Sequence, residues 1–392
     1  MNILVLNSGS SSIKFQLFDI KTNISIANGI IENIGEKNSL GYINIKNKKI
    51  VKNTPIISHK IGLEIINQLL EETNILTQHS QLAGIGHRVV HGGEKFIQPI
   101  IITNKVIKQI QKLIPLAPLH NNANIQGIKS AIKHFAHIPQ IAVFDTAFHM
   151  SIPKTAYIYP IPYKYYQQHH IRRYGFHGTS HQYVAQQCAT YLKKDLSKLN
   201  IISLHLGNGA SVCAIKNGKS IDTSMGFTPL EGLMMGTRSG NIDPAIIPYL
   251  ANNFDLTVEQ IDNILNQQSG LKGICNTKNM KEIELLIKKD KYAKLAFDMF
   301  CYRIKKYIGE YYAVLGRVDC IIFTGGIGEN SMLVREHSCS NLENLGISLS
   351  KKLNKTAHTN IAKISKKSSK TVILKIATNE ELQIALEVKK LL

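Results

Sequence analysis

Four short glycine-rich turns in this sequence each follow an apolar run, and each has the residue types of an anion site. They cover residues 7–12, 207–211, 235–240 and 325–330. Glycine lets a backbone approach a ligand closely, and consecutive backbone N–H groups form a concave anion site. Two cations accompany the turns, Lys14 just after the first and Arg238 inside the third. Four such turns with two cations favour a polyphosphate ligand.

The common nucleotide-binding and zinc-binding signatures do not occur in the sequence. No turn matches G-x-x-x-x-G-K-[ST], and no G-x-G-x-x-G opens a helix after a strand. The triplet His87-Arg88-Val89 is not the H-R-D loop of protein kinases. No H-E-x-x-H exists, so we do not interpret five histidines as zinc ligands: His120, His149, His169, His170 and His181. The six cysteines form no C-x-x-C pair and are expected to be reduced, mostly packed thiols.

The elements that must position these turns follow a mixed α/β pattern. Residues 3–6 and 13–18 predict a β-hairpin around the first turn, and residues 201–206 and 212–215 predict a second one. Two related hairpins, one near the start of each half, indicate duplicated halves. Further strands are predicted at 140–144, 319–323 and 371–377, and helices at 59–76, 122–137, 257–268, 282–315 and after residue 378. We expect Gly270 to end the third helix and Thr378 with Glu381 to form a capping box on the last.

Composition places the chain among globular proteins. It has 392 residues, 44% hydrophobic and 19% charged, which is too apolar for disorder. No apolar run reaches the ~18 residues of a membrane span, and the start lacks a signal-peptide pattern, so a cytoplasmic protein without membrane contact is expected. The net charge is +20, but the lysines are scattered. Their densest cluster, residues 363–370, is expected to be a solvated loop rather than a nucleic-acid contact.

Eight stretches along the chain resemble the acetate kinase family: NILVLNSGSSSIKFQLFD, GHRVVHGGE, PLAPLHN, FDTAFH, RRYGFHGTSH, HLGNGASVCAIKNGKSIDTSMGFTPLEGLMMGTRSGNIDP, FTGGIGEN and TNEEL. The resemblance implies an α/β fold with two duplicated domains of the actin-like ATPase (ribonuclease H-like) type and an active-site cleft between them. The implied N-terminal, acyl-side domain comprises residues 1–148 with about 382–392, and the nucleotide-side domain comprises residues 149–381.

The resemblance also implies an activity. The family transfers the γ-phosphoryl group of ATP reversibly to acetate, giving acetyl phosphate and ADP by direct in-line transfer with Mg²⁺, which Mn²⁺ can replace. A cytoplasmic homodimer that serves acetyl-CoA biosynthesis is implied as well.

Four positions resemble the catalytic residues of the family. Arg88 resembles its acetate-binding arginine, and Arg238 its arginine on the transferring phosphoryl group, where a guanidinium fork suits phosphate oxygens. His177 resembles the histidine that stabilises the equatorial oxygens. Asp145 ends an apolar strand and is expected to support the magnesium or to orient the arginines. It is not expected to be a base, because acetate is already ionised at pH 7.

The ATP and metal positions are carried over in the same way. Asn7 and Glu380 match the metal-associated positions, and Glu381 is left to cap the last helix. Lys14 and residues 205–209 resemble the phosphate contacts, and residues 326–330 the adenosine-side loop. The ATP set is Lys14, His205, Leu206, Gly207, Asn208, Gly209, Asn279, Met280, Lys281, Gly326, Ile327, Gly328, Glu329 and Asn330.

One segment departs from the family pattern. Where the family has Asp-x-Arg against the nucleoside, this chain has Asn279-Met280-Lys281, and the stretch is one residue shorter. The carboxylate is gone, and the bidentate guanidinium is replaced by a point charge. The resemblance therefore leaves the nucleotide base preference open.

The residues expected to line the acyl pocket do not decide whether the acceptor substrate is acetate or propionate. Its expected lining is Val90, Leu119, Phe176 and Pro229. In propionate kinases the position of Val90 tends to be alanine, and one methylene is worth only ~1–3 kcal/mol of discrimination, so acetate is favoured in relative terms. The sequence also leaves open a broader short-chain acyl kinase, a non-catalytic ATP-binding protein of the same superfamily and a basic nucleic-acid binder. The catalytic set argues against the non-catalytic protein, and the missing recognition motif argues against the nucleic-acid binder.

Overall fold

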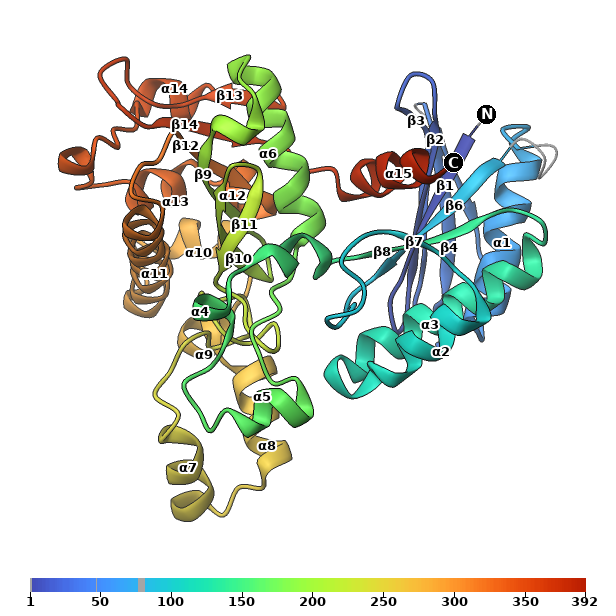
Figure 1. Ribbon diagram of the computed structural model, residues 1–392, viewed down its shortest axis with the longest axis horizontal. Coiled ribbons are helices and arrows are strands. Elements are labelled where there is room, and N and C mark those ends of the chain that lie inside the picture. Colours follow the sequence, from blue (N-terminus) through green and yellow to red (C-terminus); the bar gives the residue numbers. More distant parts are fainter. Residues whose placement is uncertain (1, 47, 77–81) are drawn as a thin grey trace. The chain divides into compact units, whose positions relative to one another are not determined.

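The computed structural model divides the chain into two compact units. It describes residues 2–46, 48–76 and 82–392, apart from the side chains of Pro118 and Leu119. Unit 1 is Met1–Phe148 with Asn379–Leu392, and unit 2 is His149–Thr378. In Figure 1, unit 1 runs from blue to teal and includes the dark red terminal helix, and unit 2 runs from green to red. The terminal segment of unit 1 begins at Asn379, so Glu380 belongs to this unit.

Unit 1 is built on an eight-stranded sheet with the order β5-β4-β3-β2-β1-β6-β8-β7. The strands are β1 (Asn2–Ser8), β2 (Ile13–Asp19), β3 (Ile24–Glu32), β4 (Leu40–Ile45), β5 (Lys48–Lys52), β6 (Leu82–Val89), β7 (Ile100–Ile101) and β8 (Gln140–Phe144). The first predicted hairpin is confirmed, because β1 pairs antiparallel with β2. On the other side of β1, strands β6 and β8 continue the sheet in parallel.

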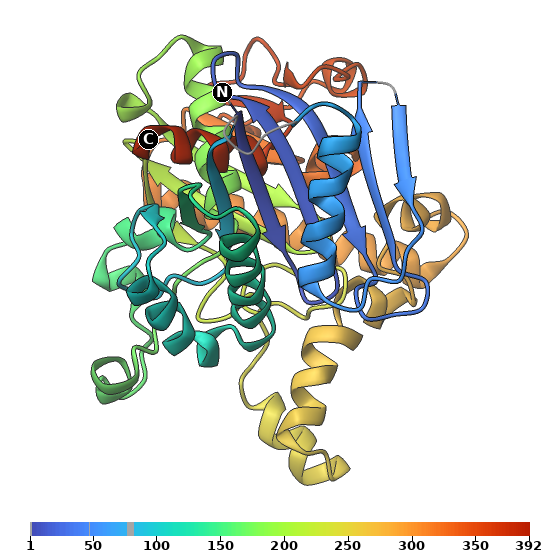
Figure 2. The same cartoon turned by 90° about the vertical axis from the view of Figure 1, so that its right-hand side faces the viewer.

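Helices pack on both faces of this sheet. α1 (His59–Glu72) and α3 (Pro118–His134) cover one face, α2 (Asn104–Lys112) packs on α3, and Figure 2 shows α1 in front of the strands. Leu4 and Leu6 point to that face, whereas Ile3 and Val5 point to α15 (Glu380–Leu391), because neighbouring strand residues face opposite ways. Gly86 of β6 lets α15 approach, since a Cβ there would lie 2.7 Å from the side chain of Ile384.

Unit 2 has a six-stranded sheet with the order β11-β10-β9-β12-β14-β13. The strands are β9 (Asn200–Leu206), β10 (Ala210–Lys216), β11 (Lys219–Thr223), β12 (Cys320–Thr324), β13 (Ile361–Lys363) and β14 (Val372–Ile376). The second hairpin is confirmed by the antiparallel β9–β10 pair, and β12 and β14 run parallel to β9. The five strands β11-β10-β9-β12-β14 therefore repeat the order and directions of β3-β2-β1-β6-β8, as the duplicated hairpins predict.

The long helices of unit 2 cover the two faces of its sheet (Figure 1). α6 (Gly178–Leu192) packs on β9, β12 and β14, and α11 (Lys291–Leu315) packs on β9 and β10. The remaining helices are α4 (Lys154–Tyr157), α5 (Lys164–His169), α7 (Ile246–Phe254), α8 (Val258–Asn263), α9 (Gly270–Cys275), α10 (Met280–Leu286), α12 (Gly325–Asn330), α13 (Met332–Ser338) and α14 (Lys351–Lys355).

Two helix expectations from the sequence are wrong, and one is confirmed. The helical region 282–315 is two helices, because Asp290 caps α11 by accepting from the backbone N of Tyr292 at 2.7 Å. The helical stretch 258–268 ends at Gln268 as expected, and Gly270, with φ +65°, begins α9. The capping box expected on α15 is wrong: Asn379 is the N-cap and accepts from Leu382 N at 2.9 Å, whereas Thr378 N donates to Glu329. Glu381 therefore has no capping-box role.

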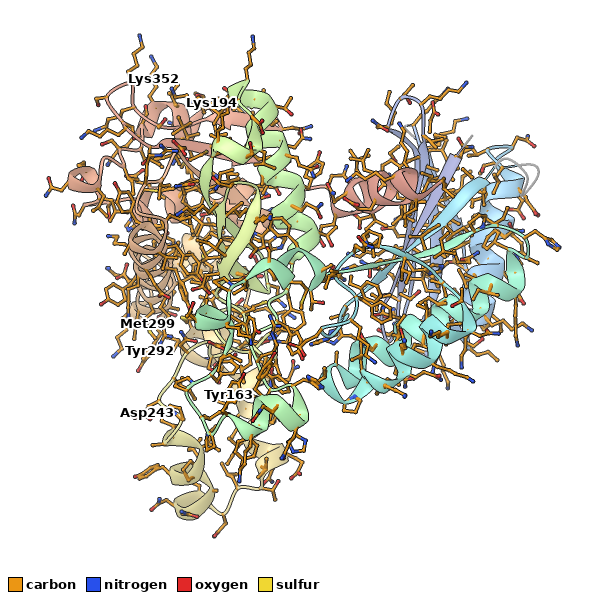
Figure 3. The ribbon with its side chains drawn as sticks, viewed as in Figure 1. Tyr163, Lys194, Asp243, Tyr292, Met299 and Lys352 are labelled. Atoms are coloured by element: carbon orange, nitrogen blue, oxygen red, sulfur yellow. The ribbon has the colours of Figure 1, made fainter. Side chains whose placement is uncertain are left out.

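The surface and the thiols agree with the expectations from composition. The four lysines within residues 363–370 are exposed, as are Lys194 and Lys352, which Figure 3 labels. All six cysteines are free thiols, and all but Cys275 are buried. Among the described residues, no helix is long and apolar enough to cross a membrane.

Candidate active site

Five polar residues of unit 1 form what we call the Arg88 cluster: Asn7, Lys14, Arg88, Asp145 and Glu380. Strand pairing brings the first four together. Asn7 lies opposite Lys14 in the β1–β2 pair, and β6 runs beside β1 and places Arg88 against Asn7. Asp145 follows β8, and its backbone N donates to Val89 O at 3.0 Å. Glu380 is the first residue of α15.

Arg88 and Asp145 form a two-point contact within this cluster. Arg88 donates from Nε to Oδ1 of Asp145 at 3.1 Å and from Nη2 to Oδ2 at 2.5 Å. Its Nη1 donates to Oδ1 of Asn7 at 3.3 Å. The side chain of Asp145 is 1% exposed and that of Arg88 is 23% exposed. The buried aspartate thus fixes the orientation of a guanidinium that keeps part of its surface exposed.

Charge in the Arg88 cluster favours an added cation. Burial lowers the pKa of Arg88, but Asp145 and Glu380 outweigh burial and hold it above its ordinary value. Burial raises the pKa of Glu380 to about 7; Asp145 and Glu381 act in the same direction, and Arg88 and Lys14 oppose them. Because the pKa of Glu380 is raised, its ionised form would be stabilised by an added cation in this part of unit 1.

The donor atoms of the Arg88 cluster fit a magnesium ion. Asn7 and Glu380 offer oxygen atoms, which Mg²⁺ prefers, and Mg²⁺ is commonly held by one or two protein groups while it keeps several waters. Both residues contact Arg88: Oδ1 of Asn7 accepts from it, and Oε2 of Glu380 lies 4.0 Å from its Nε. Within the described residues, no group of three or more His, Cys, Asp or Glu side chains has a metal-binding arrangement.

The expected acyl residues fall in both units. Val90 follows β6 and is 7% exposed; its backbone N donates to Oδ1 of Asn124 at 3.1 Å, and Asn124 donates to Ser8 O. Phe176 is buried in unit 2, and Pro229 of the same unit is half-buried. The side chain of Leu119 lies outside the described part of the chain.

Unit 2 brings His177 and Arg238 to one glycine, and we call His177, His205, Gly209 and Arg238 the His177 cluster. His177 is the N-cap of α6 and has φ +57°. A Cβ on Gly209 would lie 3.5 Å from Nη1 of Arg238 and 3.6 Å from Nε2 of His177. The His205 ring stacks on the His177 ring with centroids 4.2 Å apart. Glycine in the β9–β10 turn thus leaves space beside both side chains.

Arg238 has no counter-ion among the residues that the structure describes. Its guanidinium contacts Sδ of Met235, 3.8 Å from Nη1. Burial lowers its pKa, although an arginine stays protonated. A partly buried guanidinium without a carboxylate partner is suited to bind an anion, which would supply the missing charge.

The loop that carries Arg238 is held by backbone hydrogen bonds to the second glycine-rich turn and to the start of α9. Gly236 N donates to Asn208 O at 3.0 Å, and a Cβ on Gly236 would lie 1.9 Å from Oδ1 of Asn208. Leu271 N, at the start of α9, donates to Met235 O at 2.9 Å. Glycine at 236 therefore leaves room for the side-chain amide of Asn208, which a Cβ there would displace.

A cavity of about 310 Å³ in unit 2 brings together most of the expected nucleoside-side residues. It is lined by Asn208, Lys278, Asn279, Met280, Lys281, Glu284, Gly326, Ile327, Asn330 and Ser331. Other members of the expected ATP set lie elsewhere: His205 and Gly209 belong to the His177 cluster, and Lys14 belongs to unit 1. Glu329 uses Oε1 to accept from Gly325 N and Thr378 N, each at 3.0 Å, so its carboxylate holds the loop.

The side chain of Asn279, which lines this cavity, has a structural role. It is the N-cap of α10 and accepts from Lys281 N at 3.1 Å. Its Nδ2 donates to Oε1 of Glu282 at 2.9 Å. Both ends of the amide are thereby engaged, while Lys281 is exposed.

Several residues around these sites were not singled out by the sequence reasoning. Ser211 contacts His177, and Ser180 contacts His205. Lys278, Glu284 and Ser331 line the cavity. Ser211 lies in the second glycine-rich turn region, which was its signal, but the bond to His177 depends on how the start of α6 packs against β10.

Comparison with protein families and curated relatives gives one consistent result. The model of the acetokinase family matches residues 2–386. A protein named acetate kinase from Campylobacter concisus is 52% identical over 392 residues, which cover 100% of this chain and 99% of the relative. An acetate kinase from Helicobacter acinonychis is 51% identical over 399 residues, with 100% and 99% coverage.

Solved structures are similar over the whole chain. The crystal structure of Porphyromonas gingivalis acetate kinase has a TM-score of 0.95 and 41% identity, covering 99% of each chain. A propionate kinase from Francisella tularensis has a TM-score of 0.93 and 45% identity, covering 98% of each chain. Acetate kinase from Entamoeba histolytica has a TM-score of 0.90 and 33% identity, covering 100% of this chain and 99% of that one.

Proposed function

The chain belongs to the acetokinase family, and we propose that it is an acetate kinase that transfers the γ-phosphoryl group of ATP reversibly to acetate. The observation that carries the proposal is Arg238, a partly buried cation without a counter-ion among the described residues, beside His177 and the glycine turn at Gly209. Such a group is suited to the charge that spreads over the equatorial oxygens of a transferring phosphoryl group.

The two clusters divide the chemistry between acceptor and donor. In unit 1, Arg88 binds the acetate carboxylate, and Asp145 orients Arg88 through its two hydrogen bonds. In unit 2, Arg238 and His177 stabilise the phosphoryl oxygens, and the cavity lined by Asn208 and Gly326 takes the nucleoside side of ATP.

The transfer needs no general base. An oxygen of the ionised acetate forms the new bond to γ-phosphorus, the bond from γ-phosphorus to the bridging oxygen breaks, and ADP leaves with that electron pair. Asn7 and Glu380 would hold Mg²⁺, which neutralises phosphate charge when bound. We also propose, from the family resemblance, that the enzyme is a cytoplasmic homodimer; the mass of the purified protein in solution tests the dimer.

A second acceptor is favoured by one comparison. The propionate kinase of Francisella tularensis is 45% identical to this chain, so propionate is the alternative substrate. Val90, a buried residue two positions after Arg88, argues for the smaller acid.

An acyl hydroxamate assay distinguishes these functions. Purified protein with Mg²⁺ is given acetate, propionate or butyrate, each with ATP or GTP. The highest kcat/KM with acetate is expected. A higher value with propionate would replace the proposal by propionate kinase, and no acyl phosphate from any acid would leave a non-catalytic ATP-binding protein.

A further inference from the structure

A chain of alternating histidine and serine side chains lies behind His177. Nδ1 of His177 is 2.9 Å from Oγ of Ser211, which is 2.8 Å from Nε2 of His181. Nδ1 of His181 is 2.9 Å from Oγ of Ser203. Ser203, Ser211 and His181 are fully buried. The chain runs from the interior, at Ser203 in β9, through α6 to the ring of His177.

The number of protons available in this histidine–serine chain determines which group donates in each hydrogen bond. Among the described residues, the Ser203 hydroxyl has a side-chain hydrogen bond to His181. A buried hydroxyl proton without an acceptor is energetically costly. Ser203 therefore donates to Nδ1 of His181. A neutral His181 then carries its proton on Nε2 and donates to Ser211.

The same argument gives the proton position of His177. Because Ser211 accepts from His181, its own single proton is directed to Nδ1 of His177. A neutral His177 ring then carries its proton on Nε2. That nitrogen is the one beside Gly209 and Arg238.

We propose that Ser211, His181 and Ser203 are positioning residues that keep a proton on Nε2 of His177, so that His177 presents a donor to the phosphoryl oxygens. The inference rests on the proposed function, because it assigns the donor a phosphoryl ligand. The three residues thus do more than stabilise the fold, because they select the tautomer of His177. In the other tautomer, Nε2 of His177 would present a lone pair to an anion.

The surroundings of the chain are consistent with a neutral His181. Burial lowers its pKa well below the ordinary value, and the nearby His149 and His205 act in the same direction. Among the groups near His177 are the stacked His205, whose Nδ1 is 2.8 Å from Ser180 Oγ, and Arg238 across Gly209. His149 lies beside His181 with ring centroids 5.7 Å apart and contacts Phe176 O through Nε2.

Nitrogen NMR of the ligand-free protein tests the proton positions directly. Histidine labelled with ¹⁵N is incorporated into the full chain, and the His177 and His181 signals are assigned with His177→Asn and His181→Gln. We expect both rings in the Nε2–H form in the wild type. In Ser211→Ala, the His177 pattern should become an average of the two tautomers. An Nδ1–H form of His177 in the wild type would overturn the proposal.

Kinetics of the same variants supply the second test. Ser211→Ala should lower kcat roughly tenfold to a hundredfold and leave the KM for acetate within about twofold, because Arg88 is untouched. Ser211→Thr, which restores the hydroxyl, should recover most of kcat, and Ser203→Ala should show a smaller loss than Ser211→Ala. A wild-type kcat in Ser211→Ala would contradict the proposal.

A matched control separates positioning from general loss of a buried bond. Ser220 is fully buried in β11, and its Oγ lies 2.8 Å from Nδ1 of His149. Ser220→Ala should reduce thermal stability about as much as Ser211→Ala while leaving kcat and the His177 signals unchanged. If Ser211→Ala does not fold, Ser211→Thr and the wild-type spectrum still decide the proton position. Lack of acyl phosphate from the wild type would refute the proposed function but not the tautomer assignment.

Discussion

Asn279 donates from Nδ2 to Oε1 of Glu282 at 2.9 Å, so the residue that replaces the carboxylate of the family pattern is itself bound to a carboxylate. Thr277 donates to the other oxygen of Glu282 at 2.6 Å. An aspartate at position 279 would bring two carboxylates together at the start of α10. Asparagine at 279 and glutamate at 282 thus form a compatible pair, and restoring the family residue requires a change in both.

The first prediction concerns this pair. Asn279→Asp with Lys281→Arg should lower the melting temperature and leave the nucleotide KM unimproved, because Glu282 repels the new carboxylate. Adding Glu282→Gln restores a donor and should lower the KM for ATP severalfold, since hydrogen bonds to a charged acceptor are the stronger ones. Steady-state kinetics with ATP and GTP measure this. If the double and triple variants have the same KM for ATP and the same KM for GTP, the segment does not contact the nucleoside.

The contact between Arg88 and Asp145 predicts a loss on the acceptor side. Asp145→Asn keeps the size of the side chain but places an amide NH₂ against a guanidinium donor. We expect kcat/KM for acetate to fall roughly tenfold to a hundredfold, by analogy with the loss of an orienting partner, while the KM for ATP changes little. An unchanged kcat/KM for acetate in a folded variant would remove Asp145 from this role.

Arg238 carries the largest expected effect on turnover. Arg238→Ala should lower kcat by at least ~10³-fold, the size seen when an arginine is removed from a phosphoryl-transfer transition state. Arg317→Ala is the control, because this arginine is 69% exposed and pairs with Asp319 at 3.1 Å. Its kcat should stay near that of the wild type. A fall below tenfold in Arg238→Ala would place Arg238 outside the active site.

Val90 should decide between two acids that differ by one methylene. Val90→Ala is expected to shift the ratio of kcat/KM toward propionate by about tenfold. Val89→Ala is the matched control, since Val89 is also buried but packs in the core beneath α2 and α3. Both variants lose the same two methyl groups. An equal propionate/acetate ratio in both would show that Val90 does not line the acyl site.

Acid should destabilise the protein through a buried histidine. Burial lowers the pKa of His87 to about 4, against the bond of 2.7 Å from its Nε2 to Gln140, whereas an unfolded histidine titrates near 6.5. Between these values the unfolded state binds a proton that the folded state does not. Stability is therefore complete above pH 6.5 and is lost toward pH 4, on the order of 3 kcal/mol for this group.

Urea unfolding of the wild type and His87→Gln at several pH values measures this contribution. The variant should show a shallower decline below pH 6.5. The exposed His358→Gln is the control and should decline as steeply as the wild type. Identical slopes for all three proteins would mean that His87 is already charged in the folded state.

Local pattern predicted the parts of the fold that local forces determine. The strands around residues 3–18 and 201–215 follow from short apolar or alternating runs and from polar turns, and both hairpins are confirmed. The break at Asp290 lies in the charged run 288–291, and it was missed because helical apolar spacing flanks this run on both sides and only the cap marks the new helix. Thr378 and Asn379 compete as caps, and the bond of Thr378 N to Glu329, far away in sequence, is one the spacing could not reveal.

The same limit applies to the candidate site. Residue types and the family resemblance predicted roles for Arg88, Asp145, His177 and Arg238, because their chemistry is visible in the sequence. The engagement of Asn279 with Glu282 and the serine behind His177 depend on which side chains meet after folding. They are therefore features of packing, which a single sequence does not display.

The placement of α15 also has a consequence for biosynthesis. This helix is made after unit 2, yet it covers the face of the first sheet that carries Ile3 and Val5. While the ribosome translates residues 149–378, that face of unit 1 has no covering helix and is open to chaperones or to aggregation. Glu380 arrives with the same helix, so the nascent Arg88 cluster acquires its last carboxylate only when the sheet is closed. The core of unit 1 and the Arg88 cluster are thus completed at the same step of synthesis.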